Sequence, residues 1–86
     1  MAIKCVLVDI DNVLITEIEE VMSQEGEPDC RLIKPYRFFE EGNMQPWIKA
    51  SNQTEYMLRS EDILTIADPS PEVVQQYIEL TKEWDS

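Results

Sequence analysis

The sequence predicts a mainly β protein, with five short antiparallel strands and one C-terminal helix in a single domain over residues 1–86. Three observations predict this fold class. Short apolar, β-branched runs alternate with polar segments that contain Gly, Pro, Asn or Asp. A hairpin turn signal separates the first two runs, and the apolar residues take helical spacing only after Pro71.

The first two strands are expected to form a hairpin. Residues 3–10 are a short apolar run typical of a buried strand. Asp11 and Asn12 supply the turn, because both tolerate the left-handed conformation that two-residue hairpin turns require. The run 13–22 continues the β-branched character and favours a second strand, and a short helix capped by Thr16 is the alternative.

The next strands follow a polar loop at residues 23–29. The run 30–39 is apolar and aromatic but contains Pro35, which has no amide hydrogen to donate. This strand must therefore lie at an edge, carry a bulge or bend sharply there. A turn region is expected at residues 40–46. The fourth strand is expected in two pieces, at 47–51 and 56–59, and the last strand at 63–67.

The C-terminal segment predicts a helix over about residues 71–84. Ser70 can cap its start, Pro71 suits the first helical position, and Glu72 lies near the positive end of the helix dipole. One apolar stripe recurs at spacings of four, three and four: Val73, Tyr77, Leu80 and Trp84. We expect this stripe to pack on the sheet of the same chain, with a partner's groove as the alternative.

Composition limits the class of protein. A chain of 86 residues buries only about 60–65 % of its unfolded surface, which favours association between copies. Cys5 and Cys30 are too few for a disulfide framework and are expected to be reduced core thiols. No leader is recognised and no apolar run approaches the length of a membrane span, so a soluble, cytoplasmic protein is expected.

The charge is uneven along the chain. The sequence has 7 basic and 18 acidic residues, a net charge of −11, but residues 30–60 hold five bases and three acids. The bases in this central segment are Arg31, Lys34, Arg37, Lys49 and Arg59. They alternate with aromatic residues, a mixture that suits single-stranded nucleic acid, where cations meet phosphates and rings meet bases. The alternative is that the bases cover the outer face of strands whose aromatic residues form the core.

An acidic motif near the N-terminus raises the possibility of an enzyme. Asp9 and Asp11 follow an apolar strand and resemble the first motif of the haloacid dehalogenase superfamily, in which one carboxylate attacks phosphorus and the other is a general acid beside Mg²⁺. That superfamily needs a parallel sheet with helical crossovers, for which this chain has no room. We therefore interpret Asp9, Asp11 and Asn12 as turn residues, and expect neither an enzyme, a metal site nor a cofactor.

Residues 57–66, with the sequence MLRSEDILTI, resemble the second signature of the Sm and Sm-like RNA-binding proteins. In this signature a strand ends at Leu58, a small residue permits a tight reversal, and Ile63 with Ile66 begins the next strand. The resemblance implies that Arg59 lies at a loop mouth and lines the pore of a ring, where it contacts a base or a phosphate. Ser60 stands where the family usually has Gly.

The resemblance implies a strongly bent, five-stranded Sm-like (SH3-like) barrel whose edge strands pair between neighbouring copies. It implies a homo-oligomeric ring, with a pentamer favoured, that binds RNA or single-stranded DNA and serves RNA or DNA processing. The chain is similar to Sm-like proteins of putative cyanophage origin, which implies the cytoplasm of a bacterial host. The expected binding residues are Arg59, Arg37, Lys34, Tyr36 and Lys49. The alternative function is an acidic protein-binding module or a mimic of nucleic acid, because both ends of the chain are acidic.

Overall fold

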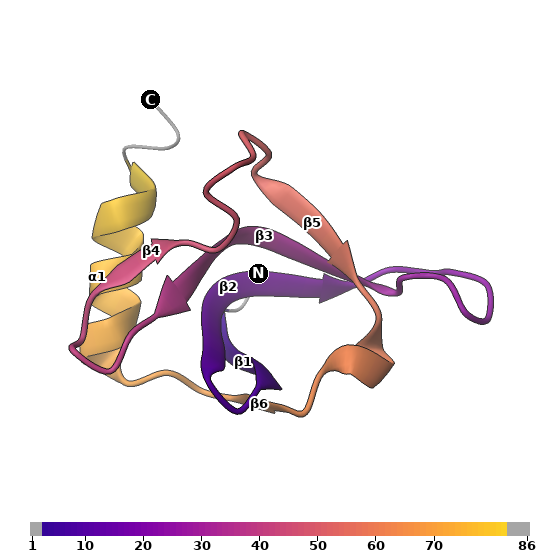
Figure 1. The fold of residues 1–86 in the computed structure, drawn as a ribbon, viewed down its shortest axis with the longest axis horizontal. Coiled ribbons are helices and arrows are strands. Elements are labelled where there is room, and N and C mark those ends of the chain that lie inside the picture. The colour runs from indigo at the N-terminus through magenta and orange to yellow at the C-terminus, as the bar shows by residue number, and fades with distance from the viewer. Residues whose placement is uncertain (1–2, 83–86) are drawn as a thin grey trace.

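A computed structural model of the protein describes residues 3–82 as one antiparallel sheet with a helix packed against it (Figure 1). Its elements are β1 (Ile3–Asp9), β2 (Asn12–Glu20), β3 (Cys30–Phe38), β4 (Met44–Pro46), β5 (Glu55–Leu58), the 3₁₀ turn η1 (Ser60–Asp62), β6 (Thr65–Ala67) and α1 (Pro71–Lys82). The strand order is β4-β3-β2-β1-β6, and β5 pairs with β3 beside β4. The predicted mainly β fold with a C-terminal helix is confirmed, with six strands where five were expected. Within residues 3–82 the sheet is open, because β5 and β6 do not pair with each other.

The two faces of the sheet carry separate small cores. The face that we call the loop face has three fully buried residues at its centre: Val6, Leu14 and Leu32. Its cover includes Trp47, Leu58 and Ile63. The opposite face, the helix face, is covered by α1 and has four buried residues at its centre: Ile15, Tyr36, Met44 and Tyr77. The predicted packing of the helix on the sheet of its own chain is thus confirmed.

β3 contains a bulge at Lys34 and Pro35. Ile15 pairs with Tyr36 and Glu17 pairs with Ile33, so two residues of β3 stand opposite one residue of β2. Lys34 takes φ 52°, the left-handed region that non-glycine residues rarely adopt. The prediction that Pro35 requires an irregular strand is confirmed. The bulge also marks the point where the neighbour of β3 changes, because β5 pairs as far as Ile33 and β4 begins at Tyr36.

Side-chain hydroxyls from β2 and α1 lie within hydrogen-bond distance of two carbonyl groups at the bulge. Thr16 Oγ1 lies 3.0 Å from the Ile33 carbonyl oxygen and 2.8 Å from the Glu17 carbonyl oxygen, so its one hydrogen can serve either acceptor. The Tyr77 hydroxyl lies 3.0 Å from the Ile33 carbonyl oxygen and 2.9 Å from the Lys34 carbonyl oxygen, so its hydrogen can serve either acceptor. Tyr77 is only 1 % exposed. Because buried carbonyl groups need donors, the bulge depends on the docking of α1.

Two sequence predictions of local structure are wrong. The strand piece at 47–51 is absent; β4 lies at 44–46, inside the expected turn region, and residues 47–54 form turns and irregular backbone. The cause is a tight hairpin in which Gly42 takes φ 96° and its amide donates to the Phe39 carbonyl. The first hairpin also turns at residues 10–11, one position earlier than expected, with Asn12 already in β2.

Other expectations agree with the fold. The run 13–22 forms a strand over most of its length, and 23–29 is a loop. Cys5 and Cys30 are free, and burial raises the pKa of both thiols. The stripe residue Trp84 lies outside the described residues. No helix within residues 3–82 is long and apolar enough to cross a membrane.

Candidate nucleic-acid interface

Arg59 stands at the end of β5, on the reversal that leads through η1 to β6. The strand ends at Leu58, as the resemblance predicts, and Ser60 begins the turn. The Asp29 carboxylate fixes this turn, because it accepts from the Ser60 amide at 2.7 Å and from the Ser60 hydroxyl at 2.8 Å. Asp29 immediately precedes β3, so the reversal is anchored to the start of that strand.

These two hydrogen bonds lower the pKa of Asp29, with the Ser60 hydroxyl as the larger cause and the Ser60 amide next. Both bonds favour the ionised carboxylate. A group whose pKa is lower in the folded state stabilises that state above its unfolded pKa, and the contribution is lost as the pH falls through the folded pKa. The anchor of the Arg59 loop is therefore present at neutral pH and is lost only in acid.

We expect the Ser60 amide to report this loss. In a titration followed by NMR, the Ser60 amide resonance should shift with a midpoint below 3.8, the ordinary pKa of the carboxyl group. Asp29→Asn removes the charge and should increase hydrogen exchange at Ser60 at neutral pH, whereas Glu20→Gln, on the preceding strand, should not. A midpoint at or above 3.8 would contradict the assigned bonds.

The Arg59 guanidinium is held by neighbouring carboxylates. Its Nε donates to Asp62 Oδ2 at 3.0 Å, and its Nη1 lies 3.6 Å from Glu61 Oε1. These contacts raise the pKa of Arg59, the Asp62 hydrogen bond most of all. The side chain remains 48 % exposed. Because the N–H groups lie in the guanidinium plane, such pairing is compatible with a base stacking on the face of that plane.

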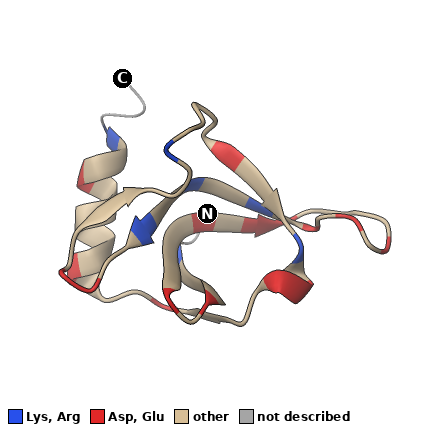
Figure 2. Ribbon diagram, viewed as in Figure 1, with Lys and Arg blue, Asp and Glu red and all other residues tan. Residues whose placement is uncertain are grey.

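The surroundings of Arg59 are acidic. A cavity of about 310 Å³ lies between the β2–β3 loop and η1, and its lining includes Arg59 together with four carboxylates: Glu25, Glu27, Asp29 and Glu61. Figure 2 shows the same charge distribution, with acidic residues on η1 and on the loop next to it. Any phosphate that approaches Arg59 in a single chain meets these negative charges at short range.

The other predicted binding residues are not gathered around Arg59. Leu58 pairs with Cys30 at the start of β3, whereas Arg37 lies seven residues further along that strand, about 23 Å away at the usual rise per residue. Lys34 lies between them at the bulge, and Lys49 lies in the exposed connection between β4 and β5. Figure 2 shows these bases spread from one end of the sheet to the other.

Tyr36 is a core residue. It is 7 % exposed, and its ring meets the Tyr77 ring edge-on with centroids 5.9 Å apart. The prediction that Tyr36 contacts a base does not fit this burial, because the ring has no open face for stacking. Its place opposite α1 follows from the bulge, which moves it to the helix face.

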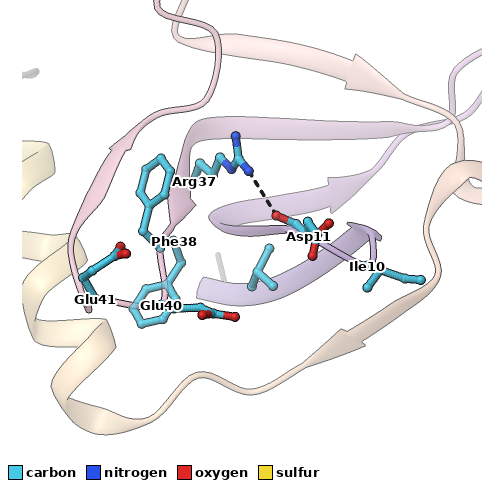
Figure 3. A pocket seen from close by; sticks show the side chains of 8 residues that line it. Ile10, Asp11, Arg37, Phe38, Glu40 and Glu41 are labelled. Carbon is cyan, nitrogen blue, oxygen red and sulfur yellow. Dashed lines mark hydrogen bonds between the residues drawn. The ribbon is translucent and has the colours of Figure 1, made fainter.

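Arg37 lines a second cavity, which the sequence does not indicate (Figure 3). Its Nη2 donates to the Asp11 carbonyl oxygen at 3.1 Å, and its guanidinium carbon lies 5.0 Å from the centroid of the Phe39 ring. Its Nε is buried with no hydrogen-bond partner among the described residues. Arg37 thus joins the β1–β2 turn to the end of β3.

The acidic motif at Asp9 and Asp11 lies in a hairpin. β1 pairs antiparallel with both β2 and β6, which is not the parallel arrangement that the phosphatase alternative requires. Asp9 Oδ1 accepts from the Ile10 amide at 2.7 Å, a local bond typical of turns. Within residues 3–82 no three Cys, Asp or Glu side chains are grouped so that they could hold a metal ion.

A family model described as a family of unknown function (DUF6561) matches residues 1–82. Because the match covers nearly the whole chain, the protein belongs to this family. No curated protein matches the sequence significantly.

Proposed function

We propose that the protein is an Sm-like, ring-forming protein that binds single-stranded nucleic acid, RNA in the first place, and takes part in RNA or DNA processing. The single observation that carries this proposal is the position of Arg59. It stands on the reversal between β5 and β6, and each of these strands has one side with no partner strand among the described residues. The resemblance of residues 57–66 to the Sm signature implies this arrangement of an arginine between two pairing edges.

The free edges of β5 and β6 support assembly. β5 pairs only with β3 and β6 only with β1 within residues 3–82. Large apolar side chains on or beside these edges are exposed: Met57 by 49 %, Leu64 by 62 % and Ile66 by 47 %. Unpaired edges that carry exposed apolar residues invite another strand. Pairing β5 of one copy with β6 of the next is a head-to-tail contact, which closes into a ring when the rotation permits. A pentamer is the ring that the resemblance favours.

Ring closure would also change the environment of Arg59. Each copy contributes one guanidinium beside its two pairing edges, so the guanidinium groups of neighbouring copies line one opening. Asp62 accepts from Nε in the guanidinium plane, and Glu61 forms an ion pair with Nη1. We therefore assign Arg59 the role of a stacking platform for bases, with phosphate contact as its lesser role. Lys34 and Lys49 remain candidates for phosphate contact outside this opening.

The test is binding of a labelled single-stranded oligouridine at low salt, followed by fluorescence anisotropy, with the matching oligothymidine as the DNA probe. Arg59→Gln should weaken binding about tenfold or more, because stacking contributes about 1–3 kcal/mol per base. Lys82→Gln is the matched control: it removes one positive charge from an exposed, ion-paired site at the end of α1. Equal affinities for the Arg59 and Lys82 variants would contradict the assigned site.

The acidic loop distinguishes the proposed function from the alternative. Glu25→Gln combined with Glu27→Gln removes two charges from the cavity beside Arg59. If nucleic acid binds there, this variant should bind oligouridine more tightly, because two repulsive charges are gone. The acidic protein-binding module would be favoured by two results together. The native protein would bind neither oligonucleotide, and it would bind a basic protein that the Glu25→Gln, Glu27→Gln variant does not bind.

A further inference from the structure

The cavity beside Arg37 lies at the other end of β3 from Arg59 and has a volume of about 420 Å³ (Figure 3). Its walls come from the β1–β2 turn, the end of β3 and the turn that follows it. They include four apolar side chains: Ile10, Val13, Phe38 and Phe39. Ile10 is 83 % exposed at the tip of a hairpin turn, a position where polar residues are usual. The cavity therefore offers an apolar surface that the described chain leaves open to solvent.

The charged groups at this cavity are mostly negative. Its lining contains three carboxylates, Asp11, Glu40 and Glu41, and one cation, Arg37. All three acidic residues are exposed, and none of their carboxylates forms an ion pair or hydrogen bond with another residue within 3–82. The Arg37 guanidinium, in contrast, already has two contacts within the chain: it donates to the Asp11 carbonyl oxygen and lies over the Phe39 ring. The unpaired charge that a ligand would meet is negative.

We propose that this cavity is a docking site for a basic peptide segment of a protein partner, with one lysine or arginine side chain seated in it. The aliphatic stem of such a side chain would lie along Ile10 and the aromatic wall, as long cationic side chains do on apolar surfaces. Its charged end would lie at the rim, where the nearby carboxylates are negative and the face of a phenylalanine ring attracts a cation. Charge complementarity selects this occupant, because an anionic ligand would meet three carboxylates against one engaged guanidinium.

This proposal is independent of nucleic-acid binding at Arg59, because the two cavities have no lining residue in common. The β3–β4 turn, which lines one cavity, and η1, which lines the other, lie at opposite ends of β3 (Figure 1). It gives the protein two binding surfaces of different chemistry. Nucleic acid would occupy the end with η1, and a basic protein segment would occupy the end with the β3–β4 turn.

The test uses the full chain in its native assembly and a capped glycine-serine peptide that carries two lysines, with the glutamine version of the peptide as control. Binding is measured by calorimetry and by ¹⁵N NMR. We expect the lysine peptide to shift the amide resonances of Ile10, Val13, Glu40 and Glu41, and an arginine version to bind in the same place. The glutamine peptide should cause no shift.

Matched variants separate a built site from general attraction to an acidic protein. Glu40→Gln combined with Glu41→Gln should lower the affinity for the lysine peptide at least fivefold. Glu25→Gln with Glu27→Gln removes the same charge at the far end of β3 and should change affinity less than twofold. Phe39→Leu should weaken binding of the lysine peptide, although it leaves the net charge of the protein unchanged. The Glu40 pair and Phe39→Leu should leave the affinity for oligouridine unchanged, and the Glu25 pair should raise it. Equal weakening by the two acidic pairs, or shifts spread over the whole acidic surface, would overturn the proposal.

Discussion

Replacing Tyr77 with alanine is expected to lower the free energy of unfolding by about 3–5 kcal/mol, the range for truncating a buried aromatic residue. Tyr77 is 1 % exposed and lies at the centre of the helix-face core, where its ring packs edge-on against Tyr36. Its hydroxyl also lies within hydrogen-bond distance of two carbonyl groups of the β3 bulge and can donate to either one. Small domains are stable by only about 5–15 kcal/mol, so this single change removes a large part of the total.

The expected loss divides into two parts that separate variants can measure. Tyr77→Phe keeps the ring and removes only the hydroxyl, and should cost about 1–3 kcal/mol because buried carbonyl groups lose a donor. Thr16→Val removes the other donor to the Ile33 carbonyl oxygen. The double variant should cost more than the sum of the single ones, since each donor partly replaces the other. Denaturant unfolding at one fixed protein concentration measures these values, because assembly also contributes to apparent stability.

Tyr77→Phe is the decisive variant for the bulge. If it unfolds with the stability of the natural protein while Tyr77→Ala is strongly destabilised, then Tyr77 acts through packing alone. In that case the bulge of β3 would be maintained by Pro35 and by the Lys34 amide, which donates to the Thr54 carbonyl oxygen.

Much of the fold follows from local sequence signals. Pro35 requires an irregularity in its strand whatever surrounds it, because it lacks the amide hydrogen that a ladder needs. The apolar stripe of α1 predicts a buried helix face, and Tyr77 lies on it. β4 gives no such signal: three residues, Met44–Pro46, pair with the end of β3 only because the turn at Gly42 brings them there. Strands this short depend on tertiary pairing more than on propensity.

The face that Tyr36 occupies could not be predicted from alternation. Along an unbroken strand, residues 32, 34 and 36 would share one face. In the structure Leu32 lies in the loop-face core and Tyr36 in the helix-face core, because the extra residue at the bulge reverses the alternation. The sequence shows that an irregularity is needed at Pro35 but not whether it adds a residue or only bends the strand.

The sequence likewise indicates one part of the candidate site, and only the fold brings the other parts together. Arg59 and the end of its strand at Leu58 are indicated by a contiguous stretch of ten residues. The anchor on Asp29 joins residues 31 positions apart, so only the paired strands bring it to Ser60. The cavity beside Arg37 is built from two separate turns, and its walls meet only after β1, β2 and β3 have paired.

Replacing Ile66 with lysine is expected to convert the proposed ring into single chains. Ile66 is 47 % exposed in the middle of β6, whose outer edge would pair with β5 of the next copy. Lysine on an edge strand opposes the addition of another strand, and its long stem lets the charge reach solvent without disturbing the chain's own sheet. Native mass spectrometry should show the mass of one chain for the variant and a closed oligomer, five chains in the favoured case, for the natural protein.

The controls for this prediction come from the geometry of a head-to-tail ring. Each copy uses both β5 and β6, so Met57→Lys on β5 should have the same effect as Ile66→Lys on β6. Ile78→Lys alters a side chain of comparable exposure, 37 %, on α1 rather than on an edge, and should leave the native mass unchanged. Because the ring gathers the Arg59 side chains, both edge variants should also weaken oligouridine binding, whereas Ile78→Lys should not. If the natural protein is a single chain at micromolar concentration, this result would contradict the proposed ring and the proposed role of Arg59 in its pore.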